Sequence, residues 1–348
     1  MTESTTPTGN NALLREATPV RKIGRLERFL GPENYRIVTG LLKTPASILG
    51  FILIALFIFI ALFAPFIIPP VRPDADPYTI PRDGYSSEPR PMMSAWERSA
   101  PPLPFWWKPI MHTDHWVHIL GTSQGQYDIF YGIVWGTRTA FKTGLIVVIA
   151  TFLIGVVIGS ISAYYGGVVD NVIMRVVDVF LTLPFILAAL ILAAILTPRI
   201  GQSLWPAVIA LIAFGWMEYS RIIRGDILSI KERDYIMAAR VIGAKDGRIL
   251  FRHILPNAIF PTMVLASLAI GDVVLSFAAL SFLGIGTQVG YADWGQVLSF
   301  ARNWISSLTT YWYIIVWPGL TLVMFVMGWN LVGDALRDVL DPRLRGKS

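Results

Sequence analysis

The sequence predicts an all-α membrane protein with six transmembrane helices. Of its 348 residues, 54% are hydrophobic and only 15% are charged, which is unlike an ordinary soluble domain. The apolar residues gather in uninterrupted stretches, and about 20 such residues suffice to cross the ~30 Å core of a lipid bilayer. The basic residues behind the net charge of +6 lie beside these stretches, as in other membrane proteins. The charge therefore indicates a bilayer and not a nucleic-acid partner.

Residues 1–45 should form a cytoplasmic tail followed by a helix on the membrane surface. Residues 1–20 are polar, a composition typical of disorder. Residues 21–43 mix bases with spaced apolar side chains, which predicts an interfacial amphipathic helix. Residues 46–68 are uncharged and long enough to cross the bilayer, so they are the first predicted span.

Residues 69–120 differ from the rest of the chain. They hold 11 of the 23 prolines and four tryptophans, a content that excludes a helix bundle. We expect an extracytoplasmic loop with its own packing, which covers the substrate entrance, meets a partner or is a passive lid. The loop contains a run of possible metal ligands, but isolated matches of this kind are usually false, so we expect no metal site. The run consists of His112, Asp114, His115 and His118.

Five further spans are expected in a core from residue 121 to 340. They are predicted at residues 143–169, 179–198, 200–217, 257–283 and 311–333. An even number of spans places both termini on one side of the membrane, and the bases near the chain ends and after residue 217 favour the cytoplasm. Residues 341–348 are a short cytoplasmic tail in this arrangement.

Residues 229–256 are the longest charged interval between apolar spans, and their pattern is helix, break, helix. Ser229 and Glu232 have the spacing of a capping box, in which each side chain bonds the other residue's backbone N–H. One narrow face then repeats at three- and four-residue steps. It is made of Tyr235, Ala238, Ala239 and Ile242.

The break in this interval is predicted at Gly243, which can adopt the left-handed conformation that closes a helix. Asp246 is placed to cap the second helix, and Pro256 is expected to end it. A short helix with an alanine face, followed by a glycine elbow, is a shape suited to docking against another protein.

At these residues the chain resembles the permease subunits of ABC importers. Met237-Ala238-Ala239, Gly243 and Leu255-Pro256 are similar to the EAA loop of these subunits, and residues 233–261 are similar to the dipeptide, oligopeptide and nickel branch. The resemblance covers roughly residues 118–345 and implies the second (C-type) permease of a pair, with a type I importer fold. In this family the loop inserts into a groove on the ATPase subunit. The residues implied in this coupling are Asp234, Met237, Ala238, Ala239, Gly243, Ala244, Asp246, Leu255 and Pro256.

One position departs from the EAA loop. Met237 stands where the motif has a glutamate, so Asp234 is the nearest carboxylate. Any ionic contact with the ATPase at this point must be rearranged or lost.

Residues 121–128 resemble the family's GTD-x-x-G-R-D segment, although Ser123 and Gln126 replace its acid and base. Two interpretations stay open, a gate element on the outer face and a turn before an interfacial helix. The residues that match are Gly121, Thr122, Gly125 and Asp128.

Asp272 and Asp178 are the candidates for the substrate pathway. Asp272 lies inside the fifth predicted span, where a carboxylate is rare and usually functional. It either attracts the ammonium group of a peptide or makes a hydrogen bond between helices.

The sequence offers no catalytic residues and no cofactor site of its own. It lacks paired carboxylates, G-x-S-x-G and H-E-x-x-H, and its final GKS lacks the rest of a P-loop. The resemblance implies a heterodimer with a second homologous permease, two ATPase subunits that bind ATP and Mg, and an extracytoplasmic binding protein, in a prokaryotic plasma (inner) membrane. The expected cargo is di- or oligopeptides. A nickel complex, an oligosaccharide, or a self-sufficient secondary transporter or channel are the alternatives.

Overall fold

The computed structural model describes residues 31, 41, 44–84, 86–98, 100–108 and 115–340. The predicted tails at 1–20 and 341–348 lie outside the described residues. So do His112, Asp114 and, apart from Gly31 and Leu41, the predicted surface helix at 21–43.

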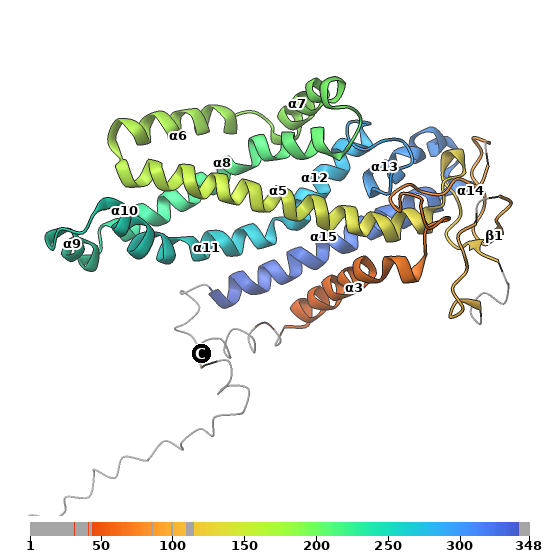
Figure 1. Cartoon of the computed structure of the whole chain (residues 1–348), viewed down its shortest axis with the longest axis horizontal. Helices are drawn as coiled ribbons and strands as arrows, with labels where there is room; N and C mark the ends of the chain where they lie inside the picture. Colours follow the sequence, from red (N-terminus) through yellow and green to blue (C-terminus); the bar gives the residue numbers. More distant parts are fainter. Residues whose placement is uncertain are drawn as a thin grey trace, which may run out of the picture.

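The described chain is mostly helical, and its long helices run along one common axis (Figure 1). The longer helices are α3 (Pro45–Ile67), α5 (Ile129–Tyr165), α6 (Gly167–Leu181), α7 (Phe185–Ile200), α8 (Leu204–Lys231), α9 (Asp234–Val241), α11 (Leu255–Leu268), α12 (Ile270–Phe282) and α15 (Tyr313–Leu340). The shorter ones are η1 (Gln124–Gln126), α10 (Asp246–Ile249), η2 (Leu250–Ile254), α13 (Trp294–Ser299), η3 (Phe300–Ser307) and α14 (Leu308–Tyr311). Two short strands, β1 (Ser94–Ala95) and β2 (Val117–His118), pair antiparallel.

The predicted all-α membrane fold is confirmed by the length and composition of these helices. Five segments of the described chain are long and apolar enough to cross a membrane: α3, α5, α8, α15 and the continuous stretch Asp246–Leu268. The pair α6 and α7 is a sixth span if its two halves, bent by 89° from each other, are taken together. The six predicted spans therefore match the number of candidate spans in the described chain when α6 and α7 are counted as one.

The span predicted at 143–169 begins 14 residues earlier, at Ile129. Arg138 and Lys142 had set the boundary in the sequence, but both lie inside α5. The Arg138 guanidinium is 5.2 Å from the Trp135 ring centre, and the Lys142 amine is 5.9 Å from that of Tyr78. Aromatic faces can accept such cations, so the charges do not end the helix.

The span predicted at 179–198 is wrong in its first half. Residues 182–184 break the helix, because Pro184 has no N–H to donate and disfavours helical backbone at Leu183. The result is the sharp bend between α6 and α7.

The span predicted at 200–217 continues to Lys231 as the single helix α8. Ser229 therefore lies inside a helix, and the predicted capping box with Glu232 is wrong. Arg233 is the N-cap of α9 instead, without a side-chain cap.

Pro256 does not end a helix, contrary to the prediction. It occupies the first turn of α11, directly after the π-helical turn η2, and the helical stretch continues through it. The fifth span therefore starts at Asp246, passes through the π-helical turn η2 and breaks only at Ala269, before α12.

Close contacts between glycines and neighbouring helices position the bundle. A Cβ on Gly159 of α5 would lie 2.3 Å from the Ser220 carbonyl oxygen of α8, and one on Gly155 would lie 2.6 Å from the Trp216 carbonyl oxygen. Small residues four apart allow such close helix crossings in membranes. In Figure 1, α5 and α8 lie centrally, α3 and α15 lie on one side, and α6 lies on the other.

The two ends of the bundle differ. Figure 1 shows α9 and α10 at one end and β1, α13 and α14 at the other. The 69–120 segment covers this second end and packs Ile80 and Trp116 against Tyr131 and Trp135 of α5. Its backbone also bonds the loop before α13, through Ile80 to Gly290 and Ala292 to Tyr78, both 2.7 Å.

Candidate functional site

Helix α9 closes with the geometry that its sequence predicts. Gly243 has φ +80°, the left-handed conformation expected there. The N–H of Ala244 bonds the carbonyl of Ala239 at 3.1 Å, and the N–H of Gly243 bonds that of Arg240 at 3.0 Å. These bonds satisfy the last carbonyls of the helix, and the glycine turns the chain toward α10.

The inner face of α9 is seated on the chain's own core. Ile236 and Ala239 are buried, in a cluster with Ala163 of α5 and Ile223 and Ile227 of α8. Ala239, predicted on the docking surface, thus faces inward, because α5 and α8 end directly behind it. Its small side chain lets α9 approach these helices.

The opposite face of α9 is apolar and exposed. Val241 is 86% exposed and Ile242 is 84% exposed, which is unusual for aliphatic side chains. Such a patch is typical of a surface that meets another protein or a membrane. We call it the outer face of α9; it comprises Tyr235, Met237, Ala238, Val241 and Ile242, all exposed.

Polar bonds fix the α9–α10 segment to the end of α5. The Tyr164 hydroxyl donates to the Asp246 carboxylate at 2.6 Å, and the Lys231 ammonium donates to the Tyr164 carbonyl at 2.6 Å. Asp246, predicted to cap the second helix, is instead its first residue and accepts this hydroxyl. The first bond ties α10 to α5, and the second ties the end of α8 to α5.

A second bond set ties α6 to α8 near the same end. Arg224 donates to both carboxylate oxygens of Asp170, at 2.6 and 2.5 Å, and the Ser162 hydroxyl donates to the same group at 2.5 Å. Paired, two-pronged bonds of this kind are strong and directional. They tie α6 to α5 and α8.

The remaining residues predicted to couple to the ATPase lie at the same end of the bundle. Asp234 is exposed in the first turn of α9, where a carboxylate is favourable, while Ala244 is partly buried beside the core. Leu255 packs on the same core and starts α11, and Pro256 is the second residue of that helix.

The two substrate-pathway candidates are not brought together. Asp272 lines a cavity of about 410 Å³ between α8, α11, α12 and α15. Asp178 lies on α6, pairs with Arg221 of α8 and is about half exposed, away from that cavity. Sequence reasoning missed Glu218 and Asp334, which line the cavity with Asp272. Each is a carboxylate within or beside an apolar run, and this sequence feature could have identified them.

The four outer-gate candidates form the turn that opens α5. Gly121 and Gly125 have φ +77° and +76°, and Thr122 accepts the Arg90 N–H at 2.7 Å. Asp128 caps α5 by accepting the Tyr131 N–H at 2.7 Å. The geometry matches the turn alternative, and a gating role stays a prediction.

His118 joins this turn to the 69–120 segment. Its Nδ1 lies 2.7 Å from the Asp128 carboxylate and its Nε2 lies 3.2 Å from that of Asp83, all three side chains being buried. Burial raises the pKa of Asp83, but the N–H groups of Glu97 and Arg98 and the His118 ring outweigh it, so the pKa is below its usual value. Within the described ranges no group of three such side chains is arranged to hold a metal.

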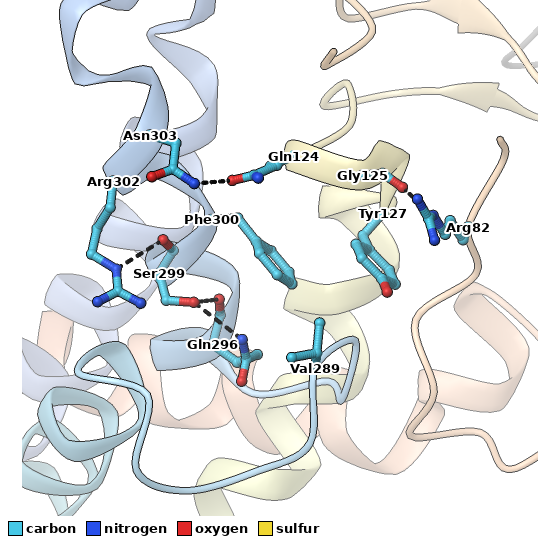
Figure 2. Close-up of a pocket in the computed structure, with 10 residues that line it drawn as sticks. All are labelled: Arg82, Gln124, Gly125, Tyr127, Val289, Gln296, Ser299, Phe300, Arg302 and Asn303. Atoms are coloured by element: carbon cyan, nitrogen blue, oxygen red, sulfur yellow. Dashed lines mark hydrogen bonds between the residues drawn. The ribbon is translucent and has the colours of Figure 1, made fainter. Parts of the chain in front are cut away.

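The surface of this end carries an open pocket of about 490 Å³ between η1 and η3 (Figure 2). Tyr127 and Phe300 stack with ring centres 5.1 Å apart. The Asn303 amide donates to Gln124 at 2.8 Å, and the Arg82 guanidinium donates to the Gly125 carbonyl at 2.6 Å. The first bond holds the turn before α5 against η3, and the second holds it against the 69–120 segment.

Asp293 is a further buried carboxylate that the sequence did not single out. It begins α13 and accepts from the Ser281 and Thr287 hydroxyls and, at 3.1 Å, from the Gly295 N–H. Burial raises the pKa of Asp293 to about 6, although these bonds oppose the shift. The residue fixes the loop between α12 and α13.

The part of the chain that contains α9 and most of the bundle matches a known family. Residues 155–346 match the family described as "Binding-protein-dependent transport system inner membrane component". The chain belongs to this family. The resemblance seen in the sequence is thereby confirmed, and this inner-membrane component is a transport permease subunit.

Curated relatives support the same assignment over most of this inner-membrane component. It is 35% identical to the dipeptide transport system permease protein DppC of Alkalihalophilus pseudofirmus, over 87% of this chain and 88% of the relative. It is 38% identical to the glutathione transport system permease protein GsiD of Pectobacterium atrosepticum, over 66% and 73%. It is 35% identical to the oligopeptide transport system permease protein OppC of Bacillus subtilis, over 67% and 73%. An inward-facing MetNI methionine ABC transporter structure covers 61% of this chain and 98% of its own, with 20% identity and a TM-score of 0.46.

Proposed function

We propose that this permease is one of two homologous membrane subunits of an ATP-driven importer that takes up di- or oligopeptides. The observation that carries the proposal is the exposed apolar outer face of α9, whose opposite face packs against α5 and α8. The names of the relatives, which specify dipeptide, oligopeptide and glutathione transport, support a peptide cargo. A nickel complex or an oligosaccharide is the alternative cargo.

The partners follow from the two ends of the bundle. One of the two ATPase subunits, which bind ATP and Mg, would dock on the outer face of α9, and the other would dock on the second permease. A binding protein would deliver substrate at the opposite end, where the 69–120 segment and the pocket of Figure 2 lie. When the ATPases close, α9 would move, and the bonds of Tyr164 and Lys231 would transmit that movement to α5 and α8. The rocking of these helices would open the path alternately to each side.

Transport by the purified assembly tests this proposal. We expect proteoliposomes that contain this chain, its second permease and both ATPases to accumulate a labelled dipeptide. Accumulation should require ATP on the side of the membrane where the ATPases lie. It should also require the binding protein on the opposite side. Uptake that persists when the ATPases are omitted would instead indicate a secondary transporter or channel.

We further propose that α9 and both termini face the cytoplasm, because basic residues crowd the α9 end of the bundle. Ser86 and Gly247 are exposed at opposite ends, and a side chain at Gly247 would meet nothing within 4 Å. The chain has no cysteine, so Ser86→Cys and Gly247→Cys can each be labelled alone. An impermeant thiol reagent should label Ser86→Cys from outside and Gly247→Cys only after the membrane is opened. The reverse pattern would invert the topology.

A further inference from the structure

The cavity that holds Asp272 is lined by four charged side chains. Asp272 opens α12, Glu218 lies near the middle of α8, and Asp334 and Arg337 lie on α15. Among the described residues none of these four forms an ion pair with another side chain. Glu218 and Asp272 both lie close enough to the Tyr219 hydroxyl to interact with it electrostatically.

Three exposed carboxylates here cannot face lipid, because an ionised side chain in the hydrocarbon core is strongly unfavourable. The cavity of about 410 Å³ is therefore suited to water or a charged solute. With three carboxylates and one guanidinium, its lining favours a cation, and it also offers one partner for an anion.

A second hollow continues the cavity along α12 and α15. It has a volume of about 380 Å³ and shares Asn330 with the first. Its other lining residues are apolar and include Leu275, Val323 and Met327. The two hollows thus form one groove with a charged half and an apolar half; we call it the α12–α15 groove.

We propose that the α12–α15 groove binds the peptide in transit, with the peptide's α-ammonium at Asp272 and Glu218 and an apolar side chain against Leu275 and Met327. The inference rests on the proposed function and adds which chemical groups of the peptide the groove recognises. A zwitterionic peptide complements both features of the groove, since its ammonium balances the carboxylates and its side chain covers the apolar half. Arg337 is the partner for a carboxylate.

Photolabelling of the assembled transporter without binding protein tests the groove directly. The probe is the dipeptide alanyl-benzoylphenylalanine, and mass spectrometry locates its attachment. We expect attachment to α12 and α15 residues of the apolar half and little attachment of the N-acetylated probe. Asp272→Asn and Glu218→Gln should each weaken labelling about tenfold, since each removes a charged partner of the ammonium. Asp272→Glu should restore it.

Asp226→Asn is the matched control, because Asp226 lies on the same helix as Glu218 but outside the cavity, beside Thr262. Its labelling should equal that of the parent protein. Attachment elsewhere, or equal labelling by the acetylated probe, would overturn the proposal that the groove binds the peptide. The proposed function would still stand in that case, provided that dipeptide uptake is observed. A disulfide formed under an added oxidant between Met327→Cys and a cysteine introduced into the second permease would show that a subunit covers the groove, and would also overturn it. If no dipeptide is transported at all, both proposals fail.

Discussion

Ile242→Asp should abolish peptide uptake while the protein stays in the membrane at its normal level. Ile242 is 84% exposed at the end of α9 and contributes nothing to the chain's core, so the folded bundle should tolerate the change. In the assembly the aspartate would be buried against the ATPase without a partner, and an unpaired buried charge destabilises such an interface by about 3–5 kcal/mol. A loss of this size weakens association by more than a hundredfold. The measurement is co-purification of the ATPases together with ATP-driven dipeptide uptake.

The control for this prediction is Ile242→Leu, which keeps an apolar side chain of the same size and should retain both readouts. Equal thermal stability of the two variants in detergent would show that the fold is intact. Normal uptake and normal ATPase binding by Ile242→Asp would mean that the outer face of α9 is not the docking surface.

The helices themselves were predictable from the sequence, but their ends were not. Hydropathy indicates which stretch of side chains can contact lipid. The helix itself can extend beyond that stretch, because it continues as long as its backbone hydrogen bonds are made. Arg138 and Lys142 interrupt the apolar run without interrupting α5, since Trp135 and Tyr78 lie over their charges. Glu218 likewise has no effect on α8, which runs on to Lys231.

In α9 and the turn after it, the local backbone conformation was predictable from the sequence, but the packing against other helices was not. The positive φ of Gly243 follows from local chain chemistry, and the sequence predicted it. Which side of α9 faces outward depends on α5 and α8, so spacing alone placed Ala239 on the wrong side. The bonds of His118 to Asp83 and Asp128 join positions up to 35 residues apart, which no local pattern reveals.

The crossing of α5 and α8 was missed, although its residues form a G-x-x-x-G pattern from Gly155 to Gly159. The pattern alone does not name the helix that packs there. The structure supplies the partner, because the Ser220 backbone of α8 occupies the space that a side chain at Gly159 would need.

Gly159→Leu should therefore destabilise the whole bundle. A Cβ at this position would lie 2.3 Å from the Ser220 carbonyl oxygen and 2.5 Å from an Ile223 methyl group, so α5 and α8 would have to separate. Overpacking of a tight contact costs about 1–3 kcal/mol, and a leucine against fixed backbone belongs at the upper end. We expect the apparent melting temperature in detergent to fall by roughly 5–10 °C, with lower abundance in the membrane.

Gly225→Ala provides the matched comparison, since Gly225 lies on α8 and a methyl group at this position would meet nothing within 4 Å. Alanine favours the helix by about 1 kcal/mol over glycine, so this variant should melt at the same temperature or slightly higher. Gly159→Ala should fall between the two, because its single methyl group already meets the Ser220 carbonyl. If Gly159→Leu melts with the parent protein, α5 and α8 do not cross at this glycine, and the rigid connection from α9 into the bundle loses its central contact.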